Sequence, residues 1–231
     1  MSRHISEQYD AELDALRRRL MEMGGLVEHQ VRDACQALLT HDAELATRVR
    51  TTDKEVNAHE LSIDDQCIHI IARRQPAASD LRLLIAMMKV CTDLERVGDE
   101  SGRIAKCALG LVGLDMPTNQ YAEIRHLAGL ASAMLSRSLD ALARLDVVAA
   151  VANISADAEV DRAYDQAIHD YSQTMEQRPE TVKALLNVFW AARALERIGD
   201  HAKNIAEHVV YLVKGQDVRH THKSGNATSR P

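Results

Sequence analysis

Two nearly identical motifs place acidic residues at a helical spacing. Residues 94–99 read Leu-Glu-Arg-Val-Gly-Asp, and residues 195–200 read Leu-Glu-Arg-Ile-Gly-Asp. Each motif puts a glutamate and an aspartate four residues apart, on one face of a helix. Two like charges at this spacing destabilise an isolated helix by about 0.2–0.5 kcal/mol. Because the unfavourable pair occurs twice, at matched places, we infer that it serves a purpose beyond solubility.

The acidic pairs lie on otherwise apolar helix faces. In the third predicted helix, residues 80–111, steps of three and four residues connect Glu95 with apolar neighbours, and Asp99 borders this face. Glu196 and Asp200 repeat the pattern in the sixth predicted helix. Such carboxylates need a cation, a hydrogen-bond donor or water, because burying them uncompensated is costly. The glycine in each motif removes bulk, which would let a ligand or another backbone approach closely.

The second predicted helix of each half supplies further oxygen atoms. Asp53 and Asn57 lie four residues apart, as do their counterparts Asp157 and Asp161. In an antiparallel bundle these side chains would face the glutamate and aspartate of the third helix. Bundle proteins hold pairs of iron or manganese ions in this way, and all-oxygen ligand sets suit magnesium, calcium or manganese. The pattern therefore predicts one cluster of candidate metal ligands in each half.

Asn204 distinguishes the two clusters. It lies one turn beyond Asp200 and adds an oxygen atom, whereas its counterpart in the first half is the cation Arg103. We therefore expect the second cluster to be the better metal site, for iron, manganese, magnesium or zinc, and we expect no organic cofactor. The candidate metal ligands are Asp53, Asn57, Glu95, Asp99, Asp157, Asp161, Glu196, Asp200 and Asn204.

Two other interpretations of the carboxylates remain open. They could form a buried ion-pair network, because Arg96, Arg103 and Arg197 lie within about a turn of them. They could also act as a catalytic acid–base pair, although nothing in the sequence indicates the substrate pocket that this chemistry requires.

Composition predicts an all-α protein. Apolar residues make up 46% of the 231 residues and aromatic residues only 3%, while four prolines and ten glycines leave few turns for a β fold. The formal charge of −6 argues against nucleic acid as a partner. The N-terminus lacks a signal-peptide region, and no apolar run approaches the ~20 residues of a membrane span. We expect a cytoplasmic protein that reaches membranes only through partners, with its four cysteines reduced and buried.

The helical pattern repeats within the chain. We predict helices over residues 5–39, 80–111, 119–145, 147–175 and 179–214, with a further helix between an N-cap at Asp42 and Pro76. Residues 53–57 match 157–161 at an offset of 104, and the acidic motifs match at 101. The sequence thus predicts two tandem three-helix bundles, residues 1–114 and 115–214, followed by a disordered tail over 215–231.

These motifs resemble the PhoU family of phosphate-signalling regulators. The resemblance includes both acidic motifs, the stretches 53–57 and 157–161, and residues 23–28, 71–82 and 213–217, so it spans nearly the whole chain. It implies a cytoplasmic protein of six helices in two pseudo-repeated bundles, often dimeric. Some members bind metal through an acidic motif that corresponds here to Glu95–Asp99 and Glu196–Asp200.

The resemblance also implies a function. Members of the family are negative regulators of phosphate uptake and of the phosphate-starvation response. They are thought to couple the phosphate ABC transporter, through its ATPase subunit, to a membrane histidine kinase. A non-enzymatic regulator is our leading hypothesis, because the sequence has no nucleophile–base set and no phosphate-binding glycine loop. The alternatives are a metal-binding carboxylate bundle with a storage or redox role, and a helical scaffold whose acidic stripes are only polar faces.

Overall fold

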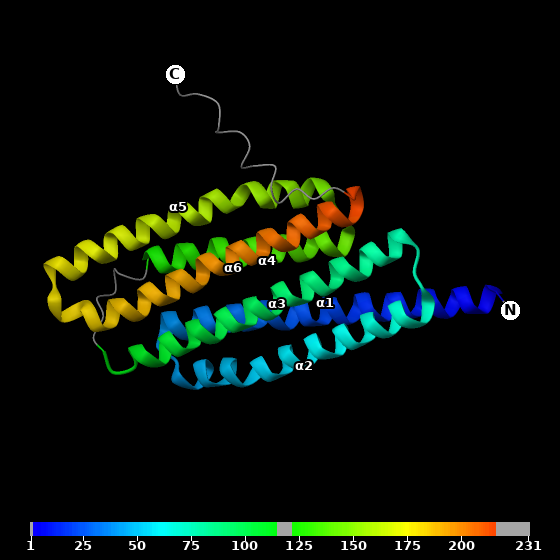
Figure 1. The fold of residues 1–231 in the computed structure, drawn as a ribbon. Helices are drawn as coiled ribbons and strands as arrows, with labels where there is room; N and C mark the ends of the chain where they lie inside the picture. The colour runs from blue at the N-terminus through cyan, green and yellow to red at the C-terminus, as the bar shows by residue number, and fades with distance from the viewer. Residues whose placement is uncertain (1, 115–121, 216–231) are drawn as a thin grey trace, which may run out of the picture.

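The computed structural model describes residues 2–114 and 122–215, and within these ranges the protein is built from helices without a strand. The first three helices form one antiparallel bundle and the last three form another (Figure 1). A short 3-10 turn, η2, precedes the last helix. The elements are α1 (Ser2–Thr40), α2 (Ala43–Arg74), α3 (Ala78–Leu111), α4 (Ala122–Arg144), α5 (Val147–Gln177), η2 (Pro179–Thr181) and α6 (Val182–Lys214).

The first hairpin of each bundle is built in the same way. The side chain of Asp42 accepts a hydrogen bond from the Leu45 backbone N–H at 2.9 Å and so caps α2, as the sequence predicts. Asp146, 104 residues later, caps α5 through two backbone N–H groups. The residues just before these caps, His41 and Leu145, both adopt left-handed backbone angles with φ near 55° (56° and 53°). The repeat seen in the sequence is therefore also a repeat of turn geometry.

The two bundles join along α3 and α6. Figure 1 shows these two helices side by side and antiparallel between α2 and α5, and α3 and α6 form the most extensive contact between helices. Both helices are apolar on two sides, and each covers part of the interface between the bundles. The interior is aliphatic, with large fully buried side chains that include Leu16, Met23, Leu84, Leu94, Ile104, Ile124 and Leu127. Each such side chain stabilises the fold by about 1.5–3 kcal/mol.

The glycines of the acidic motifs lie where neighbouring helices come closest. A β-carbon at Gly98 would lie 3.3 Å from Cγ1 of Val56 on α2, and one at Gly199 would lie 3.1 Å from Cγ1 of Val160 on α5. The two valines are equivalent in the repeat, and both are buried. The absence of a side chain at Gly98 and Gly199 thus allows α2 and α5 to pack closely against the acidic motifs.

Some details differ from the prediction. The sixth helix starts at Val182, because Pro179 opens a short 3-10 turn instead of the helix itself. The helix α1 passes through Gly24 and Gly25 without interruption. All four cysteines are buried and free, as expected. The predicted tail lies outside the described residues, except for Gly215, which ends α6 with φ 70°. Among the described residues, no helix has the length and apolar character needed to cross a bilayer.

Candidate functional site: two carboxylate clusters

The first cluster lies between α2 and α3. Burial raises the pKa of Asp53, and the nearby charge of Asp99 raises it further. The pKa of Glu95 is raised by burial and by the charges of Asp99 and Glu60. The structure therefore brings Asp53, Glu95 and Asp99 together as predicted and adds Glu60, which the sequence-based prediction missed. The signal was present, because Glu60 follows Asp53 by seven residues on α2 and so lies on the same face.

Two buried oxygen atoms meet at this cluster. Within the described part of the chain, Oδ1 of Asp53 and Oε1 of Gln30 have no donor in the amide orientation of the structure, although the Gln30 side chain is close enough to Asp53 to lower its pKa by hydrogen bonding. Both atoms lie next to Gly98. An open hollow of about 350 Å³ adjoins them, lined by Asp53, Asp99 and Gly102 together with the cations Arg50, Arg103 and Lys106.

The second cluster lies between α5 and α6. Burial raises the pKa of Asp200, and the charges of Asp157 and Asp161 add to this rise. The pKa of Glu196 is raised by burial and by Asp200, and the pKa of Asp161 is raised by burial and by Asp157. The ammonium group of Lys203 donates to the buried Asp157. The four carboxylates therefore repel one another, and two cations contact them: Lys203 at Asp157 and Arg193, which pairs with Glu196 at 2.8 Å.

The negative charge of both clusters favours a bound cation, but the side chains are not arranged to coordinate one. The Oε2 atom of Glu196 is buried without a donor, as is Oδ1 of Asp53. Yet among residues 2–114 and 122–215 no three histidine, cysteine, aspartate or glutamate side chains meet in the geometry of a metal site. Binding a metal at the second cluster would require its side chains to rotate and Lys203 to leave Asp157. The donor set fits an ion that prefers oxygen ligands.

Two predicted ligands lie apart from this convergence. Asn57 is exposed on α2. The side-chain amide of Asn204 donates to Oδ1 of Asp93 on α3 at 3.1 Å. Its counterpart Arg103 donates to another acid of α3, Glu100, at 2.6 Å. The residue one turn beyond each acidic motif thus contacts the interface between the bundles.

We name this interface the inter-repeat polar network: Asp93 and Glu100 of α3, with Arg197, His201, Asn204 and His208 of α6. Asp93 is only 8% exposed, and its two oxygens contact Nδ1 of His201 at 2.9 Å and Nε2 of His208 at 3.2 Å. Glu100 is 2% exposed and pairs with Arg197 at 2.9 Å. Burial alone would raise the pKa of Asp93, but hydrogen bonds from His201, His208 and Asn204 outweigh it, and the net pKa is lowered.

The sequence-based prediction missed this network as a unit. Asp93 and Glu100 are seven residues apart, and so are His201 and His208, so each pair lies on one helix face. That spacing could have indicated a polar stripe on each helix. The pairing of the stripes depends on how the two bundles dock, and a helical period carries no information about docking.

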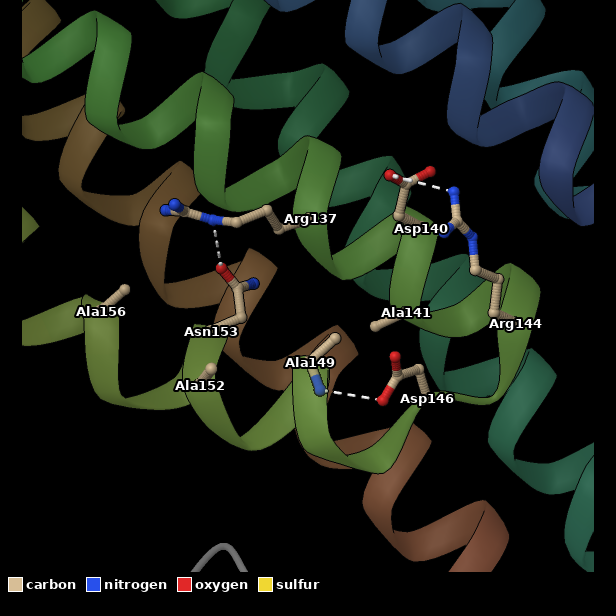
Figure 2. A pocket seen from close by; sticks show the side chains of 9 residues that line it. All are labelled: Arg137, Asp140, Ala141, Arg144, Asp146, Ala149, Ala152, Asn153 and Ala156. Carbon is tan, nitrogen blue, oxygen red and sulfur yellow. Dashed lines mark hydrogen bonds and ion pairs between the residues drawn. The ribbon is translucent and has the colours of Figure 1, made fainter.

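A separate hollow lies between α4 and α5. It measures about 260 Å³ and is lined by the residues of the α4–α5 hairpin shown in Figure 2. Its arginines are already engaged, because Arg137 donates to Asn153 at 3.1 Å and Arg144 lies 3.9 Å from Asp140. Asp146 is occupied in capping α5. The hollow therefore reflects how the hairpin is built and gathers no convergent free charge.

Comparison with known proteins gives a consistent result for both halves. A family model described as the PhoU domain matches residues 20–108 and 124–209, which fall in the two bundles. The phosphate-specific transport system accessory protein PhoU homolog of Pseudomonas aeruginosa is 47% identical over 220 residues, covering 95% of this chain and 91% of that protein. The accessory protein PhoU of Escherichia coli is 40% identical over 220 residues, with the same coverages of 95% and 91%.

Solved structures agree with the fold. The crystal structure of PhoU from Pseudomonas aeruginosa has a TM-score of 0.88 and 46% identity, covering 90% of this chain and 100% of that one. That of the phosphate transport system regulatory protein PhoU from Streptococcus pneumoniae has a TM-score of 0.84 at 29% identity, covering 91% and 99%. The match extends through both bundles and both acidic motifs, and the chain therefore belongs to the PhoU family.

Proposed function

We propose that the protein is a non-catalytic regulator of a phosphate-specific transport system. It restrains phosphate uptake and the phosphate-starvation regulon by coupling the ATPase subunit of the transporter to a membrane histidine kinase. The observation that carries the proposal is the relationship to phosphate-specific transport accessory proteins over 95% of the chain at up to 47% identity.

The shape of the protein supports this role. Long helices leave extended outer faces, and some carry exposed apolar side chains, such as Leu61 and Ile68, seven residues apart on α2 (72% and 58% exposed). Apolar residues at that spacing lie on one face and can contact a partner or a second copy of the chain. We propose that the protein works in the cytoplasm as a homodimer and meets the membrane only through its partners.

Deleting the gene tests the proposal in the host. We expect the deletion strain to produce alkaline phosphatase in high phosphate, and we expect a plasmid copy of the gene to restore repression. The matched control is a plasmid that carries a destabilised variant, Asp93→Ala, with its protein level measured on blots. Normal repression of alkaline phosphatase in the deletion strain would contradict the proposed regulation.

We also propose that the carboxylate clusters bind a divalent or ferric ion. The second cluster would hold it through Asp157, Asp161, Glu196 and Asp200, because these four carboxylates outnumber the two cations that contact them, Lys203 and Arg193. The first cluster would use Asp53, Glu95 and Asp99, and three cations line its hollow. A bound ion would stabilise the repelling carboxylates and fix α5 against α6 and α2 against α3.

Elemental analysis of protein purified without a histidine tag tests the metal sites. We expect the pair Glu196→Ala and Asp200→Ala to lose more bound metal than the matched pair Glu95→Ala and Asp99→Ala. Metal content equal to wild type in a protein with all four substitutions would contradict both sites. Metal-free wild-type protein that still represses alkaline phosphatase would favour the interpretation of the clusters as polar faces only.

A further inference from the structure

A groove along the junction of α3 and α6 lies on the polar side of the inter-repeat contact. It encloses about 700 Å³, within the usual range for small-molecule sites, and it lies between two bundles, where such sites commonly occur. Its lining runs from Glu100 to Gly110 on α3 and from Asn187 to Arg197 on α6. Ten helical residues span about 15 Å.

The groove is strongly cationic. Arg103 and Lys106 line it from α3, and Arg193 and Arg197 line it from α6. The lining contains one carboxylate, Glu100, for these four cations. One oxygen of Glu100 accepts from both Arg103 and Arg197, so each guanidinium group keeps most of its five N–H donors for a ligand. Guanidinium forks match phosphate oxygens, and Arg103 is 54% exposed.

An aromatic ring stands beside these charges. Trp190 also lines the groove and is 61% exposed, an unusual setting for the largest side chain in the protein. Phe189 supports it with an edge-to-face contact at 5.7 Å between ring centroids. Arg193 follows Trp190 by about one helical turn on the same face and lines the same groove. Its guanidinium group lies 5.8 Å from the centroid of the Tyr164 ring and pairs with Glu196 at 2.8 Å. Exposed aromatic faces stack on nucleobases, and adjacent arginines hold phosphates.

We propose that the α3–α6 groove binds a nucleoside di- or triphosphate. The base stacks on Trp190, and the phosphates lie among Arg103, Lys106, Arg193 and Arg197, whose net positive charge matches a polyphosphate. The ligand contacts both bundles, so it would bind across the inter-repeat junction. This inference does not depend on the proposed role in phosphate transport, because it rests on the groove alone.

Trp190 is the one tryptophan of the chain, so it serves as its own reporter. Titration of the full-length protein with ADP and ATP should change tryptophan fluorescence saturably. Calorimetry provides affinities for variants. We expect Lys106→Gln and Arg193→Gln each to weaken ADP binding at least tenfold. Lys106→Gln keeps the test sharp, because Arg193 also pairs with Glu196 and its loss could alter the fold.

The matched control is Arg144→Gln, which removes an exposed arginine from the α4–α5 hollow of Figure 2 and should leave ADP affinity unchanged. Binding of tripolyphosphate tests the phosphate part of the ligand alone, and binding of adenosine tests the nucleoside part alone. We expect Trp190→Leu to weaken ADP about tenfold while changing tripolyphosphate binding less than twofold. The proposal is overturned if ADP and ATP do not bind at millimolar concentration, if Lys106→Gln and Arg193→Gln bind ADP like wild type, or if Trp190→Leu affects ADP and tripolyphosphate equally.

Discussion

The two carboxylate clusters arise from the same repeated pattern but meet different cations. In the second cluster Lys203 reaches the buried Asp157 and occupies part of the space between the acids. The equivalent residue in the first half is Gly102, and the space there remains an open hollow of about 350 Å³ lined by Arg50, Arg103 and Lys106. The second cluster thus contains its own cation, whereas the first is bordered by cations from outside.

The same difference extends to the contact between the repeats. The position of Asp93 on α3 is taken by Ala194 on α6, and the position of Glu100 is taken by His201. One copy of the helix therefore presents acids, and the other presents histidines and an arginine. Two copies of α3 would set carboxylate against carboxylate. The divergence of the repeats makes them complementary, which explains how one sequence pattern can build both sides of an interface.

Removing Asp93 should have the largest effect on stability. Asp93→Ala gives α3 the residue of α6 and leaves His201, His208 and Asn204 without their shared acceptor. We expect the free energy of unfolding to fall by about 3 kcal/mol, because an uncompensated buried polar group is costly. Glu100→Ala should cost only about 1 kcal/mol, because its arginine partners are 54% and 35% exposed and can turn to water. Urea unfolding measures both, and equal losses would contradict the difference.

Removing the lysine from the second cluster, or introducing one into the first, should have the next largest effect, in this case on metal affinity. Lys203→Met removes the competitor from Asp157, and we expect manganese to bind about tenfold more tightly, which is about 1.4 kcal/mol. The matched variant is Gly102→Lys, which is sterically allowed because a β-carbon there meets nothing within 4 Å. We expect it to weaken metal binding at the first cluster. Calorimetric titration with manganese that shows no change in either variant would mean that Lys203 and the ion do not compete.

Helix capping should distinguish the hairpins by a smaller amount. Asp146 accepts from two backbone N–H groups at 2.9 and 3.0 Å, whereas Asp42 accepts from one at 2.9 Å. Loss of a cap costs about 1 kcal/mol. We expect Asp146→Ala to destabilise the protein more than Asp42→Ala, with both losses measured by thermal unfolding. The reverse order would show that the second hydrogen bond adds nothing.

Neutralising a carboxylate of the clusters should have the smallest effect on the free energy of unfolding, and the sign of this effect depends on pH. The pKa values of Glu196 and Asp200 are raised in the folded protein, so folding favours their protonated forms. Their contribution to stability is therefore lost as pH rises above their ordinary values of 4.5 and 3.8. We expect Glu196→Gln to stabilise metal-free protein at pH 7 by about 0.5 kcal/mol.

The stability contribution of Asp93 should depend on pH in the opposite direction. Its pKa is lowered in the folded protein, so its contribution is present above its ordinary value of 3.8 and lost as pH falls below it. Unfolding measured from pH 3 to pH 7 should therefore show a low-pH loss that Asp93→Ala removes. The high-pH loss should be reduced by Glu196→Gln. A pH profile that neither variant alters would contradict both assignments.

Local patterns predicted most of the fold. The apolar period located all six helices, Asp42 was identified as a cap from its place before a periodic segment, and the internal repeat predicted two bundles. Each of these features depends on residues close together in the chain, or on similarity between two segments.

The candidate sites were less predictable because they depend on docking and side-chain rotation. Glu60 and the pairing of Lys203 with Asp157 could have been suggested by helix faces. The turning of Asn204 toward Asp93 of α3 could not, because it follows from the docking of one bundle against the other. Asp93 and Glu100 were overlooked for the same reason, since their partners on α6 lie more than 90 residues away in the sequence.

Recovery of partners from membranes tests the proposed function most directly. Purified protein is immobilised and incubated with detergent-solubilised membranes from cells grown with or without phosphate, and the bound proteins are identified by mass spectrometry. We predict that the ATPase subunit of the phosphate transporter and the histidine kinase are retained, in amounts that change with phosphate. Recovery of neither protein under either condition, by wild-type protein shown to be folded, would contradict the proposal.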